Sequence, residues 1–157
     1  MARMKPRRHA LLLLVLLADA AGCARHPPRA AVGLLEDGVA VFVAHHPLAA
    51  GQALRVDEVA RTPGASYHVV QARGAEAPHR HVAHDLTVHV LAGEGVLAVG
   101  SRRVRLRAGD VALIARGVTH WFTPAGGRPA VALAVFSPPL DAPDLVPVDV
   151  DSSGDGG

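Results

Sequence analysis

Short apolar runs, separated by segments that contain Gly or Pro, constrain the fold of this 157-residue chain more than any other feature. Each run is four to eight residues long, which suits a β-strand and is too short for a typical helix. Many short strands with Gly- and Pro-containing turns favour a β-sandwich or barrel. The expected strands cover residues 39–44, 54–60, 66–73, 86–91, 96–99, 103–107, 111–115 and 131–136. The predicted fold class is therefore all-β.

Local patterns within these runs predict burial and turns. Residues 111–115 and 131–136 are almost wholly apolar, as expected for strands that are buried on both faces. Gly100 and Ser101 stand between two runs as a pair with Gly first, which is typical of a tight hairpin turn. The only helical candidate is a short segment at 33–36 with its flanks.

Three histidines are spaced so that their side chains can meet. His79 and His81 lie two residues apart on a segment that we expect to be extended. Because side chains alternate along a strand, both imidazoles point to the same face. His120 follows 39 residues after His81 and can complete the set from a later strand. Three neutral imidazoles that converge in a barrel mouth make a site for a transition metal.

The other histidines of this region have weaker patterns. His68 stands on a predicted strand. Either its ring makes its hydrogen bonds within the sheet, or it points toward the metal from a neighbouring strand. His84 lies in the connection after His81, where it can approach the site. His89 alternates with two valines that we expect to face inward, so His89 is predicted to face outward.

An alternating stripe of arginines occupies the run at 103–107. Arg103, Arg105 and Arg107 are separated by apolar residues, which is typical of the solvent face of a hairpin strand. The alternative interpretation is a patch that faces an anion, such as an acidic envelope polymer or a lipid head group.

The N-terminus has the organisation of an export signal. Four basic residues precede an unbroken apolar run at 10–18, which is too short for a membrane span of about 20 residues. Small residues at 20–22 lead to Cys23, the only Cys of the chain, so no internal disulfide can form. The segment resembles a bacterial lipoprotein signal, in which Cys23 would be lipidated and would become the new N-terminus. The alternative is a plain secretory signal with an incidental Cys.

The remaining sequence fits one small domain between two polar ends. We expect a signal peptide at 1–22, a Pro-rich lipidated tether at 23–32, one domain at 33–148 and a disordered tail at 149–157. Loss of the signal changes the formal net charge from +2 to about −1, because four basic residues and one acidic residue are removed. That balance gives no argument for nucleic-acid binding.

The spacing of glycines and histidines resembles the two motifs of the cupin superfamily. The residues that carry the resemblance are Gly74, His79, His81 and Gly93 in the first motif, and Gly109, Gly117 and His120 in the second. The resemblance covers about residues 64–137. It implies a single cupin domain, which is a double-stranded β-helix or jelly-roll barrel. It also implies that His79, His81 and His120 bind one divalent metal, with Fe, Mn, Zn, Ni and Cu all open.

The first motif of the superfamily also has a Glu ligand, and its place in this chain is ambiguous. Counting back from Gly93 puts Leu86 at the Glu position, whereas counting forward from His81 with the shorter spacing puts Asp85 there. Either Asp85 is a fourth ligand, or no carboxylate completes the site. A shift of one residue turns a side chain to the other face of a strand, and Leu86 suits the interior better than Asp85.

The resemblance leaves the activity open, because the cupin fold supports many unrelated functions. The first hypothesis is a metal-dependent small-molecule dioxygenase or related oxidoreductase. The second is a non-catalytic module that binds or senses a small molecule or metal, and the third is an envelope scaffold with a vestigial pocket. The expected location is the bacterial cell envelope, on the periplasmic side, with a lipid anchor in the membrane. Cupins often pair through an edge, so the resemblance leaves a homodimer open, and Trp121 is interpreted either as a packing residue or as part of a dimer contact.

Overall fold

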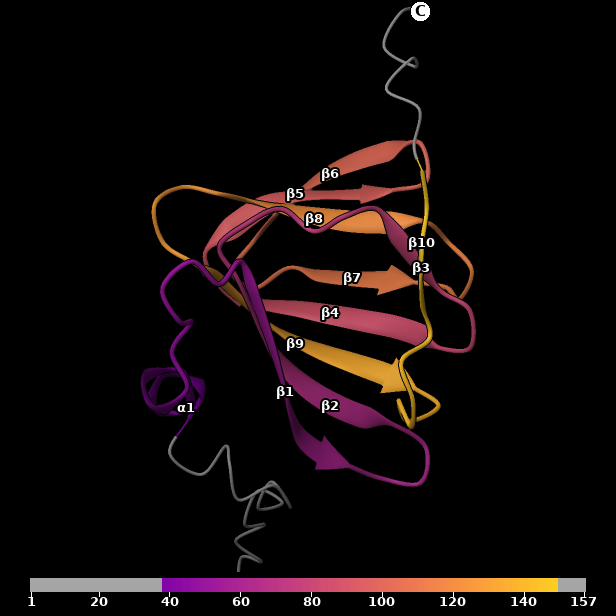
Figure 1. Cartoon of the computed structure of the whole chain (residues 1–157), viewed down its shortest axis with the longest axis horizontal. Coiled ribbons are helices and arrows are strands. Elements are labelled where there is room, and N and C mark those ends of the chain that lie inside the picture. The colour runs from indigo at the N-terminus through magenta and orange to yellow at the C-terminus, as the bar shows by residue number, and fades with distance from the viewer. Residues whose placement is uncertain (1–37, 150–157) are drawn as a thin grey trace, which may run out of the picture.

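A computed structural model describes residues 38–149 of the chain. It contains one helix and ten strands within that range (Figure 1). The elements are α1 (Val39–His45), β1 (Leu54–Arg61), β2 (Ser66–Ala72), β3 (His79–His81), β4 (Asp85–Ala92), β5 (Glu94–Val99), β6 (Arg102–Arg107), β7 (Val111–Ile114), β8 (His120–Ala125), β9 (Ala130–Ser137) and β10 (Leu145–Pro147). The signal, the lipidated tether and the helical candidate at 33–36 lie outside the described residues, as does the tail beyond 149.

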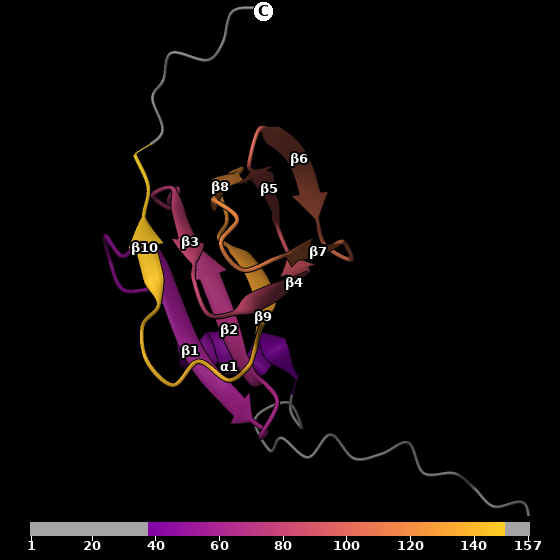
Figure 2. The ribbon, with the colours of Figure 1, turned by 90° about the vertical axis from the view of Figure 1, so that its right-hand side faces the viewer.

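The strands form two five-stranded sheets that face each other (Figures 1 and 2). One sheet has the order β1-β2-β9-β4-β7, and the other has the order β10-β3-β8-β5-β6. Every pairing is antiparallel. The all-β prediction is therefore confirmed, and the chain has the two-sheet jelly-roll architecture.

The core lies between the sheets and draws on both of them. Its buried members are Leu86, Val90, Leu97, Leu106, Ile114, Ala134 and Phe136. Strand β9 has only one exposed residue, Ser137, in agreement with its apolar sequence, although three of its residues are only partly buried. The hairpin prediction is also confirmed, because Gly100, with a φ of +55°, and Ser101 join β5 to β6.

The run at 39–44 is a helix, so its assignment as a strand was wrong. Val39, Phe42 and Val43 have the spacing of one helical face, and this face packs on the outer side of the β1-β2-β9 sheet. Phe42 is 7% exposed and belongs to a second cluster with Val59 and other residues of that side. The sequence of this run is rich in valine, which favours a strand, and seven residues are too few to show a clear helical period. Its packing against the sheet, rather than its local sequence, makes it a helix.

Strand β7 differs from the prediction that it is buried on both faces. Ile114 is buried, whereas Val111 and Leu113 are 58% and 78% exposed. The reason is position, because β7 is the edge strand of its sheet and no helix covers the outer face beside it in the part of the chain that the structure describes.

Strand β10 was not predicted, and it extends the second sheet beyond β3. Leu145, Val146 and Pro147 pair with His81, Arg80 and His79 in register. The segment after β9 thus returns to the strand that carries two of the candidate ligands.

Among residues 38–149, no helix has the length and apolar character needed to cross a membrane.

Candidate metal centre

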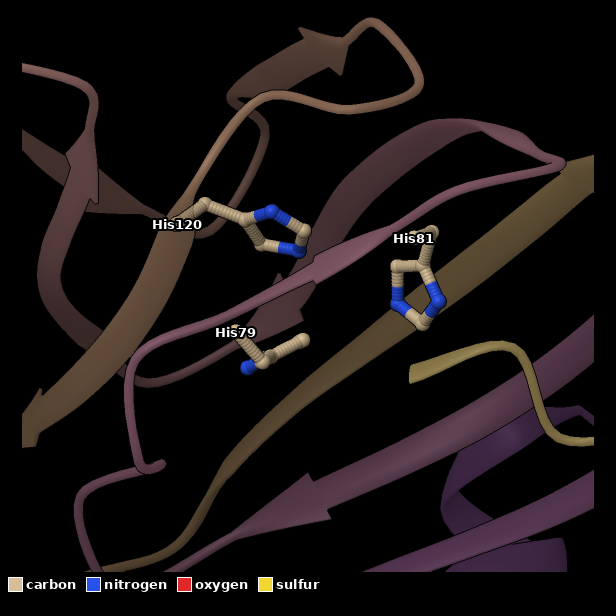
Figure 3. A group of neighbouring side chains, drawn as sticks. All are labelled: His79, His81 and His120. Atoms are coloured by element: carbon tan, nitrogen blue, oxygen red, sulfur yellow. The ribbon is translucent and has the colours of Figure 1, made fainter. Parts of the chain in front are cut away.

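Strands β3 and β8 bring the three predicted histidines together. His79 and His81 alternate with the exposed Arg80 on β3, so both rings point to the same side. His120 is the first residue of β8 and lies directly opposite His79 in the register. Figure 3 shows the three rings around a common space. The ring centroids are 4.4 Å apart for His79 and His120, 5.3 Å for His79 and His81, and 5.5 Å for His81 and His120.

The nitrogens of the trio are close enough to share one ion. One nitrogen from each ring lies within 4.8 Å of the other two. All three residues are nearly inaccessible to solvent, at 7%, 8% and 3% exposure for His79, His81 and His120. A divalent transition metal takes imidazole ligands of this kind, so the trio can hold such a metal.

Hydrogen bonds fix which nitrogen of each ring is free. Nδ1 of His79 lies 2.8 Å from the carbonyl oxygen of Ala77, and Nδ1 of His120 lies 3.0 Å from that of Val118. A carbonyl only accepts, so both Nδ1 atoms carry the proton and both Nε2 atoms keep a lone pair. His81 is oriented in the same way, because its Nδ1 lies 2.7 Å from Oδ1 of Asp144. This is the arrangement that usually supports metal-bound histidines.

His120 supplies a direct test of whether a metal fits. Its Nε2 is the only buried side-chain nitrogen or oxygen without a hydrogen-bond partner among the described residues. An unsatisfied buried acceptor is costly, and coordination of a cation would satisfy it. Burial lowers the pKa of His120 to about 4; the carbonyl of Val118 opposes that change, and His79 and His81 add to it. His120 is therefore neutral near pH 7, as a metal ligand must be.

Asp144 was missed by the sequence analysis. It precedes β10, and its two carboxylate oxygens hold two histidines, with Oδ1 on His81 and Oδ2 2.6 Å from Nδ1 of His84. Burial acts to raise the pKa of Asp144, but hydrogen bonds from His84, His81 and the backbone N–H of Ala83 lower the pKa to about 2. His84 does approach the site, as its position after His81 allowed. It contacts Asp144, which also bonds His81, and it is not a member of the trio. No local pattern marks Asp144, because 63 residues separate it from His81.

The structure places Asp85 outside the trio. Its carboxylate pairs with the guanidinium of Arg116 at 2.7 Å and accepts the backbone N–H of Arg116 at 3.0 Å. Hydrogen bonds from Arg116 lower the pKa of Asp85 to about 2, and its side chain is about half exposed. Leu86 is 8% exposed and lines the cavity, so the apolar residue occupies the inward position of β4. Asp85 as a fourth ligand does not fit this geometry.

A cavity of about 770 Å³ lies between the sheets and includes the trio in its wall. Most of the lining is aliphatic, with Phe122 and Phe136 as its aromatic residues, and no Lys or Arg lines it among the described residues. Leu86, Val88 and Val90 of β4 face the cavity, which puts His89 on the opposite face, as predicted. The site is therefore a set of nitrogen ligands at the edge of a mainly apolar space.

The arginine stripe lies on the exterior. Every Arg of β6 is exposed, and Leu106 alone is buried. The guanidinium of Arg103 lies 4.6 Å from the centre of the Trp121 ring, and Arg105 is 3.7 Å from Glu94. These contacts fit the solvent face of a hairpin strand.

Comparison with known proteins agrees with this architecture. The family model described as "Cupin domain" matches residues 66–136. An uncharacterized protein of Aquifex aeolicus is 36% identical over 97 residues, which are 62% of this chain and 79% of that protein. The chain therefore contains a cupin domain at residues 66–136.

Solved structures show the same fold at low sequence identity. An uncharacterized conserved protein of Klebsiella pneumoniae with a double-stranded beta-helix domain has a TM-score of 0.59 and 22% identity, over 69% of this chain and 95% of that one. KdgF from Halomonas sp. has a TM-score of 0.51 and 23% identity, over 55% and 81%. The Streptomyces nucleoside dehydratase Pac13 has a TM-score of 0.55 and 17% identity, over 64% and 82%. At these identities the likeness concerns the fold alone.

Proposed function

We propose that this cupin binds one divalent transition metal through His79, His81 and His120 and acts as a metal-dependent oxidoreductase of the dioxygenase type on a small molecule. One observation carries the proposal. Each Nδ1 is held by an acceptor, and the three remaining Nε2 atoms belong to rings grouped at the wall of a cavity large enough for a small molecule. Iron, manganese, nickel, copper and zinc remain candidates.

The chain's own residues would hold and orient rather than transfer protons. A metal bound to three imidazoles supplies Lewis acidity or O₂ activation and leaves coordination positions for a substrate. The trio has no lone pair left to act as a base, and Leu86 brings no carboxylate to the site. The aliphatic wall would exclude water from the bound molecule.

Metal content of purified variants tests the proposed site. The wild-type chain should retain close to one divalent ion per chain by elemental analysis. His79→Ala and His120→Ala should retain little, because a three-ligand site has no redundancy. His89→Ala, on the opposite face of β4, is the matched control and should be loaded like wild type. Equal loading of all variants would show that the metal is bound elsewhere.

Asp85→Asn addresses the fourth position. The carboxylate of Asp85 pairs with Arg116 outside the trio, so its loss should leave metal affinity unchanged. A strong decrease in affinity would restore Asp85 as a ligand.

A non-catalytic binding or sensing module is the second candidate function. It is favoured by the position of Leu86, since the site lacks the carboxylate that the cupin motif normally provides. Oxygen consumption by metal-loaded protein with candidate substrates separates the two. Turnover abolished by chelators and by His81→Ala supports the enzyme, whereas a well-occupied site without turnover supports the binding module.

We also propose that the protein is a lipid-anchored component of the bacterial cell envelope, on the periplasmic side. The support is the sequence pattern at 20–23, which ends at the only Cys of the chain.

A further inference from the structure

His68 places a second polar group in the cavity wall, apart from the metal trio. It lies on β2 between Tyr67 and Val69, which pack on the α1 side, and it lines the cavity together with Val70. Its side chain is 4% exposed, and its ring meets the edge of Phe136 at a centroid distance of 5.2 Å. Neither the proposed ligands nor the Asp144 network uses this imidazole.

The hydrogen bonds of Ser66 determine where the proton of His68 resides. Ser66 is fully buried, and its hydroxyl oxygen accepts the backbone N–H of Leu140 at 2.9 Å. The same hydroxyl lies 2.9 Å from Nε2 of His68, which is the only acceptor within reach of the hydroxyl proton among the described residues. A buried hydroxyl that keeps its proton paired must therefore donate to Nε2. The neutral ring then carries its own proton on Nδ1.

Nδ1 of His68 has no protein partner among residues 38–149 and is not sealed from solvent. The only fully buried and unpaired side-chain nitrogen or oxygen there is Nε2 of His120, so Nδ1 of His68 retains accessible surface. The ring that carries this N–H lines the cavity, where the accessible surface of Nδ1 can meet an occupant. Burial lowers the pKa of His68, with Glu58 opposing and Arg61 adding to the change, which agrees with a neutral ring.

The other polar groups near the cavity are already engaged. Glu58 is held by Arg61 at 2.7 and 2.8 Å, and Glu76 accepts the backbone N–H of Phe122 at 2.9 Å. Asp141 also pairs with Arg61, and Asp144 holds two histidines. Outside the metal trio, His68 is therefore the polar group of this mainly apolar wall that has a donor without a protein partner among the described residues, and a placed polar group of this kind fixes the orientation of an apolar ligand.

We propose that the Nδ1–H of His68 donates a hydrogen bond to an oxygen acceptor on an apolar small molecule bound in the cavity. The chemical class is a hydrocarbon-rich compound with a carbonyl or similar oxygen, and without a charge on the part that contacts His68. This inference rests on the proposed function in that the same molecule would be presented to the metal. His68 is thus a binding residue that selects the ligand by its oxygen.

The first test measures the tautomer of His68 directly. Long-range ¹H–¹⁵N NMR of the metal-free wild-type chain at neutral pH should show a protonated Nδ1 and an unprotonated Nε2. Ser66→Ala removes the hydroxyl donor and should shift the ring toward the form protonated at Nε2. A wild-type ring protonated at Nε2 would overturn the inference, and this result does not depend on whether any variant folds.

The second test measures ligand choice on the same metal-free chain, so that it is independent of metal binding. Acetophenone and ethylbenzene are similar in size, and only acetophenone has a carbonyl acceptor. His68→Leu should weaken acetophenone binding by about fivefold to tenfold more than ethylbenzene binding, the value of one net hydrogen bond, in a titration followed by amide chemical shifts. His89→Leu, on the outer face, is the matched control and should alter neither affinity.

Two outcomes of the titration would contradict the inference. One is an equal change for both probes in His68→Leu, which would make His68 a packing residue. The other is the absence of saturable binding of acetophenone to the wild-type chain. Both can occur with a fully functional metal site, so they are distinguishable from failure of the proposed function.

Discussion

At the scale of single residues, Asp144 links the segment between β9 and β10 to the candidate metal centre. Its carboxylate fixes the ring of His81 through Nδ1 and also receives His84 and the N–H of Ala83. The other ring nitrogen of His84 lies 3.1 Å from the carbonyl oxygen of Pro139, so His84 is held at both nitrogens. Asp144 is thus a positioning residue for the candidate ligand His81.

We expect Asp144→Asn to weaken metal binding by about 10- to 100-fold, the usual effect of losing such a support. The amide offers one oxygen where the carboxylate offers two, so the orientation of His81 or His84 is lost. Competition with a chromophoric chelator measures the affinity. Asp141→Asn is the control, since Asp141 belongs to the same segment but pairs with the exposed Arg61. Equal affinities in the two variants would remove Asp144 from the site.

The depressed pKa of His120 predicts how the metal-free chain responds to acid. The ordinary pKa of 6.5 applies when the chain is unfolded, and the folded value is about 4. Between these values the unfolded chain binds a proton that the folded chain does not, so the free energy of unfolding falls as the pH falls. The loss should be on the order of 3 kcal/mol across this window, and absent above it.

Urea unfolding at several pH values, with a chelator present, measures this dependence. His120→Phe removes the titrating group and should flatten the curve between pH 6.5 and 4. A curve of unchanged slope in His120→Phe would assign the acid sensitivity to other groups.

The sequence located some site residues and missed others for a physical reason. The His79 and His81 pair follows from the two-residue period of a strand, and His120 from its spacing after the glycines. Asp144 depends on a contact between segments far apart in sequence, and no periodicity encodes it. Ser66 and His68 are two residues apart on one strand, but the contact of Ser66 with Leu140, which leaves the hydroxyl proton for His68, is again long-range. The choice between Asp85 and Leu86 needed the register of β4, which the structure supplies.

At the scale of elements, turn glycines shape the frame around the site. Gly93 joins β4 to β5 with a φ of +75°, a conformation that L side chains rarely adopt. A Cβ at this position would lie 2.8 Å from the Cα of Ala130, at the start of β9. The glycine of the first motif is therefore required both by its own backbone angle and by the strand beside it.

Gly93→Ala should lower the free energy of unfolding by roughly 2–4 kcal/mol, because backbone strain of roughly 1–3 kcal/mol is added to a clash with backbone. Gly126→Ala is the matched control. Gly126 has a φ of +92°, but nothing lies within 4 Å of the added Cβ, so this variant has the strain without the clash. Denaturant unfolding of both variants measures the difference. Equal losses would show that Ala130 moves aside without cost.

The sequence correctly predicted the strands whose residue types and lengths alone identify them. The runs that became β1, β2, β4, β5, β6 and β9 lie where residue type and length placed them. The sequence wrongly predicted a strand where α1 forms and burial of both faces of β7. An apolar run does not show whether it will pack on a sheet face or border solvent. Strand β10 has only three residues, and it forms because β3 offers it an edge.

At the scale of the whole molecule, one sheet carries the candidate ligands and the other supplies much of the cavity wall. Strands β3 and β8 of one sheet carry the trio, while β2, β4 and β9 of the other sheet supply His68 and much of the aliphatic wall. The segment from Leu140 to Pro147 touches both: its start bonds Ser66, and its end pairs with β3. A ligand in the cavity would therefore contact both sheets and this segment.

Attachment to a membrane is the last prediction, and it concerns the protein as a whole. If the pattern ending at Cys23 is a lipoprotein signal, Cys23→Ser should abolish incorporation of labelled fatty acid. Stable anchoring needs more than one acyl chain, and a lipoprotein carries its acyl chains at this Cys. The Cys23→Ser protein should therefore move from the membrane fraction to the soluble envelope fraction, or stay unprocessed. His120→Ala, which keeps Cys23, is the control and should remain labelled and membrane-bound. Unchanged fractionation of Cys23→Ser, with no label in the wild-type protein, would instead indicate a plain secretory signal.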